Sequence, residues 1–110
     1  MENEELCEIR FTAGSIEEAR VTARYLVQER LVACAKIIPW IESVYRWNGE
    51  LDTSQESAVL LKTRRVLFEK VAAIIKKNSK YEVPEIVAFP ISDLNADYRE
   101  WVLEETVNTH

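Results

Sequence analysis

The two cysteines are the side chains in this sequence best suited to binding a soft metal ion. Thiolate sulfur suits soft metal ions, so Cys34 and Cys7 are the candidate metal ligands. Both residues also fit a plainer role, because free cysteine is among the most buried residue types in proteins. Two separated cysteines do not form the dense pattern of a disulfide scaffold, and we expect both to be free thiols.

Other groups that support metal or catalytic chemistry are missing from the sequence. The single histidine is His110, and neither a CxxC nor an HExxH spacing occurs, so a closed zinc site is not expected. One histidine at that position cannot build a Ser-His or Cys-His pair, and no nucleophile elbow is present. The only glycines, Gly14 and Gly49, do not make a phosphate-binding loop. We therefore expect a protein that is not an enzyme.

Size and charge narrow the class of protein further. The 110 residues are 47% hydrophobic, which is enough for one core, and we expect a single domain over 1–110. The net charge of −5 repels phosphate backbones and anionic lipids, so neither nucleic acid nor membrane is an expected partner. No apolar run approaches the roughly 20 residues of a membrane span. Residues 1–5 are acidic, unlike a signal peptide, and we expect a cytoplasmic protein.

Hydrophobic periodicity predicts the order strand, helix, strand, strand, helix, strand, with one more helix at the end. Residues 6–12 alternate as a strand does, and Ser15 with Glu18 forms a capping box before a helix that ends at Glu29. On the last helix, Tyr98 and Trp101 are expected to cover the sheet as core aromatics. The other predicted elements are strands over 32–38 and 41–47 with a break at Pro39, a strand ending in 58–63, a helix over 66–77, a strand over 85–89 and a last helix capped by Asn95.

This order predicts an α+β, ferredoxin-like βαββαβ sandwich. Two successive βαβ units with right-handed crossovers give a four-stranded antiparallel sheet with both helices on one face, and the other face lacks a cover. Asn48-Gly49 indicates a type I′ hairpin turn. Each hairpin arm, at about fifteen residues of roughly 3.3 Å, is too long for a globule whose radius of gyration is near 13 Å. Part of the hairpin must therefore leave the body.

The projecting part of the hairpin carries apolar side chains, namely Ile41, Val44, Tyr45, Trp47 and Leu51. An exposed apolar hairpin usually marks an interface. Self-association with closed symmetry would cover both this hairpin and the free sheet face. We expect Tyr45 and Trp47 to pack in that subunit interface.

Several segments, read together in order and spacing, resemble the CutA family of divalent-cation tolerance proteins. The resemblance implies a cytoplasmic homotrimer with a fold akin to the PII signalling proteins and a link to tolerance of divalent metals, copper above all. The segments are 31–39 (LVACAKIIP), 43–49 (SVYRWNG), Glu56, 61–63 (LKT), 81–86 (YEVPEI) and 98–101 (YREW).

The resemblance also implies a set of residues near the clefts between subunits: Glu56, Lys62, Tyr81, Glu82 and Glu85. Oxygen ligands of this kind suit weak, exchangeable binding of a small ligand or a hard cation. The alternative is that Glu82 and Glu85 are solvated loop charges, or that they pair with Lys62 across the subunit boundary.

The sequence departs from the family pattern at one position that matters for copper. The family commonly has a histidine just before the Tyr-x-x-Pro-Glu motif, whereas Asn78, Ser79 and Lys80 stand there in this chain. Because Cys34 stands in a resembling segment, the resemblance makes it the first candidate for a copper ligand and Cys7 the second. A copper site made of Cys34 and that histidine is not available. Two functions remain: a copper tolerance protein that binds copper or another divalent cation weakly as a homotrimer, and a PII-like trimer that senses a small molecule or a partner protein without physiological metal.

Overall fold

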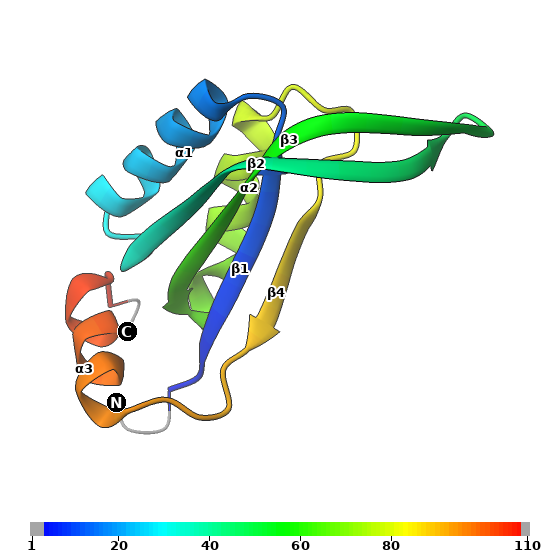
Figure 1. Ribbon diagram of the computed structural model, residues 1–110. Helices are drawn as coiled ribbons and strands as arrows, with labels where there is room; N and C mark the ends of the chain where they lie inside the picture. The colour runs from blue at the N-terminus through cyan, green and yellow to red at the C-terminus, as the bar shows by residue number, and fades with distance from the viewer. Residues whose placement is uncertain (1–3, 109–110) are drawn as a thin grey trace.

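A four-stranded sheet with a long projecting hairpin dominates the computed structural model, which describes residues 4–108 (Figure 1). Its principal extents of 47 × 25 × 22 Å reflect that projection. The predicted element order is confirmed. The elements are β1 (Leu6–Ala13), α1 (Ile16–Gln28), β2 (Cys34–Trp47), β3 (Glu50–Arg64), a 3₁₀ turn (Arg65–Leu67), α2 (Phe68–Asn78), β4 (Ile86–Pro90) and α3 (Ala96–Glu105).

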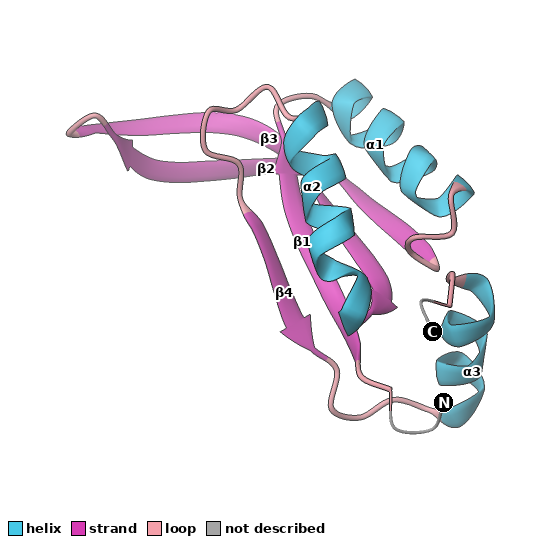
Figure 2. Cartoon of the chain, turned by 180° about the vertical axis from the view of Figure 1, so that it is seen from behind, coloured by secondary structure: helices cyan, strands magenta, loops and turns pink. Residues whose placement is uncertain are grey.

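The sheet has the strand order β2-β3-β1-β4, and every neighbouring pair is antiparallel. Helices α1 and α2 lie side by side over one face, as predicted, while α3 stands apart from them (Figure 2). Ile9 at the centre of β1 pairs with Leu61 on β3 and with Ala88 on β4. The fold is therefore the expected α+β sandwich with an added C-terminal helix.

The main core lies between this sheet and the two helices. Cys7, Ile9 and Phe11 alternate along β1 and pack in one cluster with side chains of β3, α1 and α2. Helix α1 begins as predicted, because the Ser15 hydroxyl accepts a hydrogen bond from the Glu18 amide at 3.1 Å. The alternation along β1 leaves the residues between these core positions pointing to the opposite face.

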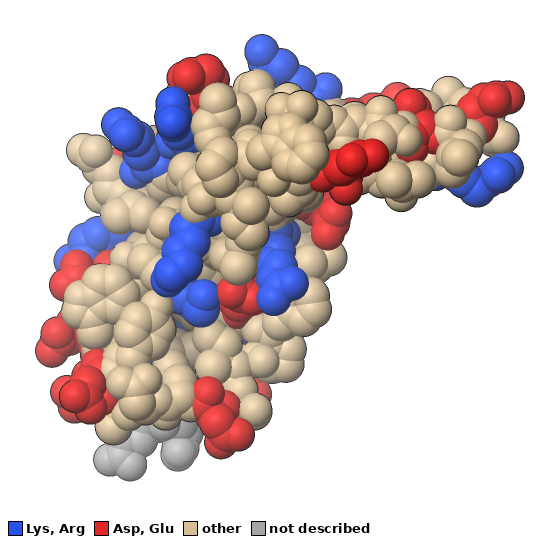
Figure 3. Space-filling view, in the orientation of Figure 1, with Lys and Arg blue, Asp and Glu red and all other residues tan. Residues whose placement is uncertain are grey.

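The opposite face, which we call the open sheet face, carries charged and apolar side chains from all four strands. Helix α3 packs at one end of it through a small cluster of Leu6, Ala33 and Val102. Lys and Arg side chains gather in its middle (Figure 3). The residues that alternation assigns to this face are Glu8 and Arg10 of β1, Cys34, Lys36 and Ile38 of β2, Leu60 and Lys62 of β3, and Val87 and Phe89 of β4.

Strands β2 and β3 extend beyond the body as the predicted hairpin (Figure 1). Its turn has φ of 52° at Asn48 and 82° at Gly49, the two positive values that a type I′ turn needs. The predicted break at Pro39 is a bulge rather than an end of the strand: β2 continues through it, and the pairing with β3 shifts register between Ile38 and Ile41. A bulge fits because proline has no amide to donate to the ladder, and the Pro39 carbonyl accepts from the Ser57 hydroxyl at 2.8 Å.

A buried ion pair attaches α3 to the sheet. The Arg64 guanidinium pairs with Glu4 at 2.6 Å and donates to the Thr106 hydroxyl at 2.8 Å and to the Leu103 carbonyl at 2.7 Å. The side chains of Arg64 and Glu4 are only 5% and 6% exposed. One side chain of β3 thus holds together the N-terminal segment and the end of α3.

Tyr98 and Trp101 of α3 were both predicted to cover the sheet as core aromatics, and only one of them does so. Tyr98 reaches the sheet, where its hydroxyl lies 3.3 Å from the sulfur of Cys34. Trp101 packs against the Tyr98 ring, with centroids 5.6 Å apart, but its side chain stays exposed and Val102 takes the buried position instead. A ten-residue helix that docks by one edge buries a narrower stripe than the sequence spacing suggested.

Candidate functional site

A hollow of about 670 Å³ lies at the root of the projecting hairpin. The hairpin contributes one wall, and the loop over 79–85 that leads from α2 to β4 contributes the other. Acidic side chains gather at the root of the hairpin and along it (Figure 3). Hairpin side chains in the wall include Ser43, Tyr45, Trp47, Asp52 and Glu56, and loop side chains include Lys80, Tyr81, Glu82 and Glu85.

Glu56 is the most firmly positioned carboxylate of this hollow. The Tyr81 hydroxyl donates to its Oε2 at 2.6 Å, and the Ser43 hydroxyl donates to its Oε1. Burial, and next the hydrogen bond to the Glu56 carboxylate, raise the pKa of Tyr81 well above its usual value. Tyr81 therefore stays a neutral phenol that donates to Glu56. A Cβ placed on Gly14 would lie 3.4 Å from the Tyr81 hydroxyl, so the phenol lies against the turn that follows β1.

The hollow brings together four of the five residues that the family resemblance implied: Glu56, Tyr81, Glu82 and Glu85. It also contains Tyr45 and Trp47, which the sequence assigned to a subunit interface. Sequence reasoning missed Ser43 and Asp52, although the period of a strand could have found them. Ser43 shares a face with Tyr45 and Trp47, and Asp52 pairs directly with Tyr45 across the hairpin.

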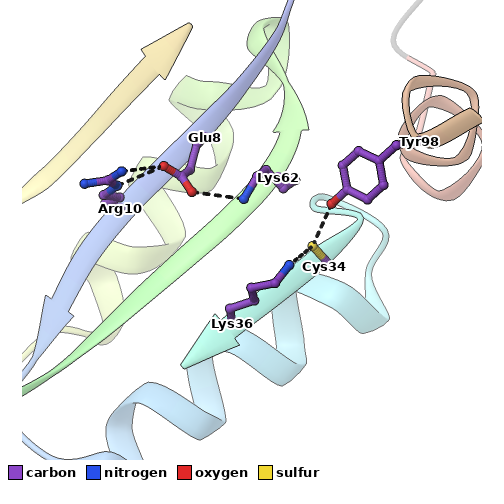
Figure 4. Close-up of polar contacts among 6 residues, drawn as sticks. All are labelled: Glu8, Arg10, Cys34, Lys36, Lys62 and Tyr98. Carbon is purple, nitrogen blue, oxygen red and sulfur yellow. Dashed lines mark hydrogen bonds and ion pairs between the residues drawn. The ribbon is translucent and has the colours of Figure 1, made fainter. Parts of the chain in front are cut away.

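Lys62, the fifth residue of that set, does not line the hollow and lies instead on the open sheet face. Its ammonium pairs with Glu8 at 2.9 Å, and Glu8 also accepts from Arg10 at 2.9 Å (Figure 4). Burial is the largest single influence on Glu8 and raises its pKa, but the hydrogen bonds and charges of Lys62 and Arg10 together outweigh it, so the pKa of Glu8 is lowered. The Arg10 guanidinium in turn lies 4.6 Å from the centre of the Phe89 ring.

Cys34 is near Lys62 and not near the hollow, since the two residues pair across β2 and β3. Its sulfur lies 3.3 Å from the Tyr98 hydroxyl and 4.0 Å from the Lys36 ammonium (Figure 4). Burial, and next the contact with Cys34, raise the pKa of Tyr98 to about 12, so Tyr98 also remains a neutral phenol. Cys34 as a residue is only partly buried, and its sulfur is of the kind that soft metal ions prefer.

Cys7 occupies the main core, as the plainer interpretation of the sequence predicts. It is fully buried on the helix-covered face, and burial raises the pKa of its thiol to about 11. The sheet separates it from Cys34. Within residues 4–108, no three side chains of histidine, cysteine, aspartate or glutamate lie close enough to hold a metal ion. His110, the only histidine, lies outside the described residues.

Ser79, one of the three residues just before the Tyr-x-x-Pro-Glu motif, lies next to Tyr81 of the hollow. Its hydroxyl accepts from the Tyr81 amide at 3.1 Å. Tyr81 approaches the turn that follows β1, whereas Cys34 is level with Glu8 near the start of that strand. Gly14 is six residues after Glu8, so the two levels are about 20 Å apart at roughly 3.3 Å per residue. Residue 79 and Cys34 are therefore not members of one site within a single chain.

Comparisons with known proteins agree on one family. The family model described as CutA1 divalent ion tolerance protein matches residues 7–105. The divalent-cation tolerance protein CutA of Thermus thermophilus is 44% identical over 98 residues, which cover 89% of this chain and 95% of that protein. The chloroplastic CutA of Arabidopsis thaliana is 38% identical over 97 residues, and these span 88% of this chain but only 53% of that longer protein.

Solved structures give the same result. The crystal structure of CutA1 from Oryza sativa has a TM-score of 0.93 at 34% identity and covers 96% of this chain and 97% of that one. The Thermus thermophilus structure has a TM-score of 0.89 at 42% identity and covers 93% and 99%. The names of these relatives carry no enzymatic activity. Within residues 4–108, no helix has the length and apolar character needed to cross a membrane. By sequence and by fold, this chain belongs to the CutA1 divalent ion tolerance family.

Proposed function

We propose that this chain acts in divalent-cation tolerance as a homotrimer that binds copper weakly, as Cu(I), through Cys34. The supporting observation is the position of Cys34, a partly buried cysteine on a sheet face that most of the chain leaves uncovered. A thiolate is the donor that Cu(I) prefers. A cytoplasmic location would suit this role, because a reducing compartment keeps the thiol free.

The ligand set of a single chain suits weak binding and not tight binding. Cys34 supplies one sulfur, and its neighbours are the neutral Tyr98 phenol and the Lys36 ammonium, which cannot bind a metal while protonated. Copper would therefore need sulfur from more than one subunit, which a symmetric assembly can provide by bringing the open sheet faces together. Loss of the thiol proton accompanies such binding, so affinity should rise with pH.

Two exposed apolar surfaces support the trimer. On the hairpin, Val44 and Leu51 are 62% and 73% exposed, and on the open sheet face Ile38 and Phe89 are also exposed. Apolar surface of this extent usually binds another chain. The strand order also leaves β2 and β4 as sheet edges, and a head-to-tail ring of subunits can use both the edges and the hairpins.

The first test is assembly and copper binding by the reduced protein. Light scattering should give the mass of three 12.8 kDa chains at micromolar concentration, and a monomer there would refute the trimer. In a competition titration with a Cu(I) indicator, Cys34→Ser should abolish binding, while Cys7→Ser should retain it if that core variant stays folded. Retention of Cu(I) binding in Cys34→Ser would refute the role of Cys34.

The hollow favours a second candidate function, a PII-like trimer that senses a small molecule and needs no metal. Its volume of about 670 Å³ lies within the range of about 300–1,000 Å³ that is common for small-ligand sites. It also lies far from Cys34 along the sheet, so a ligand there need not share residues with copper. Titration of wild-type protein and Glu56→Gln with small organic ligands tests this function separately from the copper titration.

A further inference from the structure

The hollow at the hairpin root has a strongly negative wall. Four carboxylates line it, and they oppose the single ammonium of Lys80, which is exposed to solvent. Two of them come from the hairpin and two from the loop, so negative charge faces the hollow from both walls. The four are Asp52, Glu56, Glu82 and Glu85. An anionic ligand such as a nucleotide would be repelled from this hollow.

Aromatic side chains form the rest of the binding surface. Trp47 and Tyr45 lie on the hairpin and remain partly exposed, while Tyr81 comes from the loop. The Tyr45 hydroxyl donates to the Ser54 hydroxyl at 3.2 Å, which ties this side chain to the neighbouring strand. The electron-rich face of such rings attracts a cation, most strongly in tryptophan.

The carboxylates are spread around the hollow and do not converge on a point. No three acidic, cysteine or histidine side chains within residues 4–108 could share one metal ion. Asp52 and Glu56 are four residues apart on one strand, about 13 Å at roughly 3.3 Å per residue. Within residues 4–108, a bare divalent cation would therefore not find three such ligands together, whereas an organic cation with an apolar body can meet a carboxylate and a ring together.

Glu56 is prepared to accept a hydrogen bond from such a ligand. Its two oxygens are held by hydroxyl donors from Tyr81 and Ser43, yet each carboxylate oxygen can accept more than one hydrogen bond. The group stays in place without losing its capacity to accept. A fixed carboxylate beside aromatic faces gives specificity for a positively charged nitrogen because no side chain has to be reordered on binding.

From these observations we infer that the hollow binds a small organic cation, a primary amine or diamine whose apolar part lies against the ring of Tyr81 and whose nitrogen meets Glu56. The inference rests on the second candidate function, the small-molecule trimer, and names the chemical class of its ligand. It is independent of copper binding at Cys34.

Calorimetric titration of the assembled wild-type protein tests the inference with four probes: 2-phenylethylamine, 1,4-diaminobutane, phenylacetate and calcium chloride. Both amines should bind, phenylacetate should not, and calcium should compete poorly. Glu56→Gln keeps the shape of the side chain but removes its charge, and should weaken amine binding by about tenfold or more.

Two further variants keep the test decisive. Glu82→Gln removes a charge on the loop without touching the Tyr81 and Ser43 contacts, and should also weaken amine binding, even if Glu56→Gln fails to assemble. Glu69→Gln, an exposed carboxylate on α2 outside the hollow, is the matched control and should leave amine affinity unchanged. Equal weakening by Glu69→Gln would mean non-specific attraction to net charge and would refute the site.

The outcomes separate the inference from the function on which it rests. Phenylacetate binding that Glu56→Gln alters, with no amine binding, would overturn the cationic ligand but keep a small-molecule site. If no organic probe binds at millimolar concentration, both are overturned. Cys34→Ser should leave amine affinity unchanged, and a parallel loss of amine and Cu(I) binding would overturn the separation of the two sites.

Discussion

Replacement of Arg64 by methionine should destabilise the protein strongly, because it removes one partner of a buried ion pair. Arg64 and Glu4 are 5% and 6% exposed and lie 2.6 Å apart. Arg64→Met leaves the Glu4 carboxylate buried without its cation, and leaves the Leu103 carbonyl and Thr106 hydroxyl without their donor. Loss of one partner of such a pair typically costs about 3–5 kcal/mol, and the lost hydrogen bonds overlap with that cost rather than adding to it.

The assay is urea unfolding at a fixed protein concentration, since the proposed assembly would make apparent stability depend on concentration. Arg65→Met, at the exposed neighbouring position, is the control and should change the free energy of unfolding by less than about 0.5 kcal/mol. Arg64→Met combined with Glu4→Met should recover much of the loss, because the stranded charge is removed as well. A loss under about 1 kcal/mol in Arg64→Met, or no recovery in the double variant, would refute the reasoning.

The same substitution should alter the surroundings of Cys34. Arg64 holds the end of α3, and α3 carries the Tyr98 hydroxyl that contacts the Cys34 sulfur. Faster reaction of Cys34 with a thiol reagent in Arg64→Met, under conditions where the variant is still folded, would show that α3 shields the thiol. An unchanged rate would mean that α3 stays docked through its apolar cluster alone.

Three further predictions follow from single residues. Trp47→Ala should weaken the proposed trimer before it unfolds the subunit, by roughly 2 kcal/mol or more, and unchanged dissociation in sedimentation experiments would exclude the hairpin from the interface. Gly49→Ala forces an alanine to φ of 82° and should lower stability by about 1–2 kcal/mol in thermal unfolding, whereas Glu50→Ala beside it serves as the control. The lowered pKa of Glu8 means that its ion pairs stabilise the fold above the ordinary pKa of 4.5, and that this contribution is lost as pH falls through the lower folded-state value. Glu8→Gln should therefore be less stable than wild type at pH 7 and equal to it in strong acid, and a difference that persists there would contradict this explanation.

Local signals in the sequence predicted much of the fold because each acts over a few residues. The Ser15 cap, the Asn48-Gly49 turn and the alternation along 6–12 depend on neighbouring atoms, and the structure confirms all three. The bulge at Pro39 was mistaken for a break, because proline ends a ladder or distorts it according to the partner strand, which the local sequence does not specify.

The site was harder to predict because it depends on distances along strands. Glu56 and Lys62 match the same family pattern, yet six residues of β3 separate them, which is about 20 Å at roughly 3.3 Å per residue. One therefore lies in the hollow and the other beside Cys34. The contacts of Tyr81 with Glu56 and of Tyr98 with Cys34 join segments that are 25 and 64 residues apart, and no local pattern encodes them.

The bulge at Pro39 and Trp40 also affects how readily a newly made chain aggregates. Strand β2 is a sheet edge of fourteen residues, and before partners are met its unpaired amides and carbonyls are a template for indiscriminate strand addition. Pro39 offers no amide, and the register shift beside it interrupts the regular spacing that an added strand would need. The chain can thus carry a long sheet edge, available to the proposed assembly, while fibril growth along that edge is made less favourable.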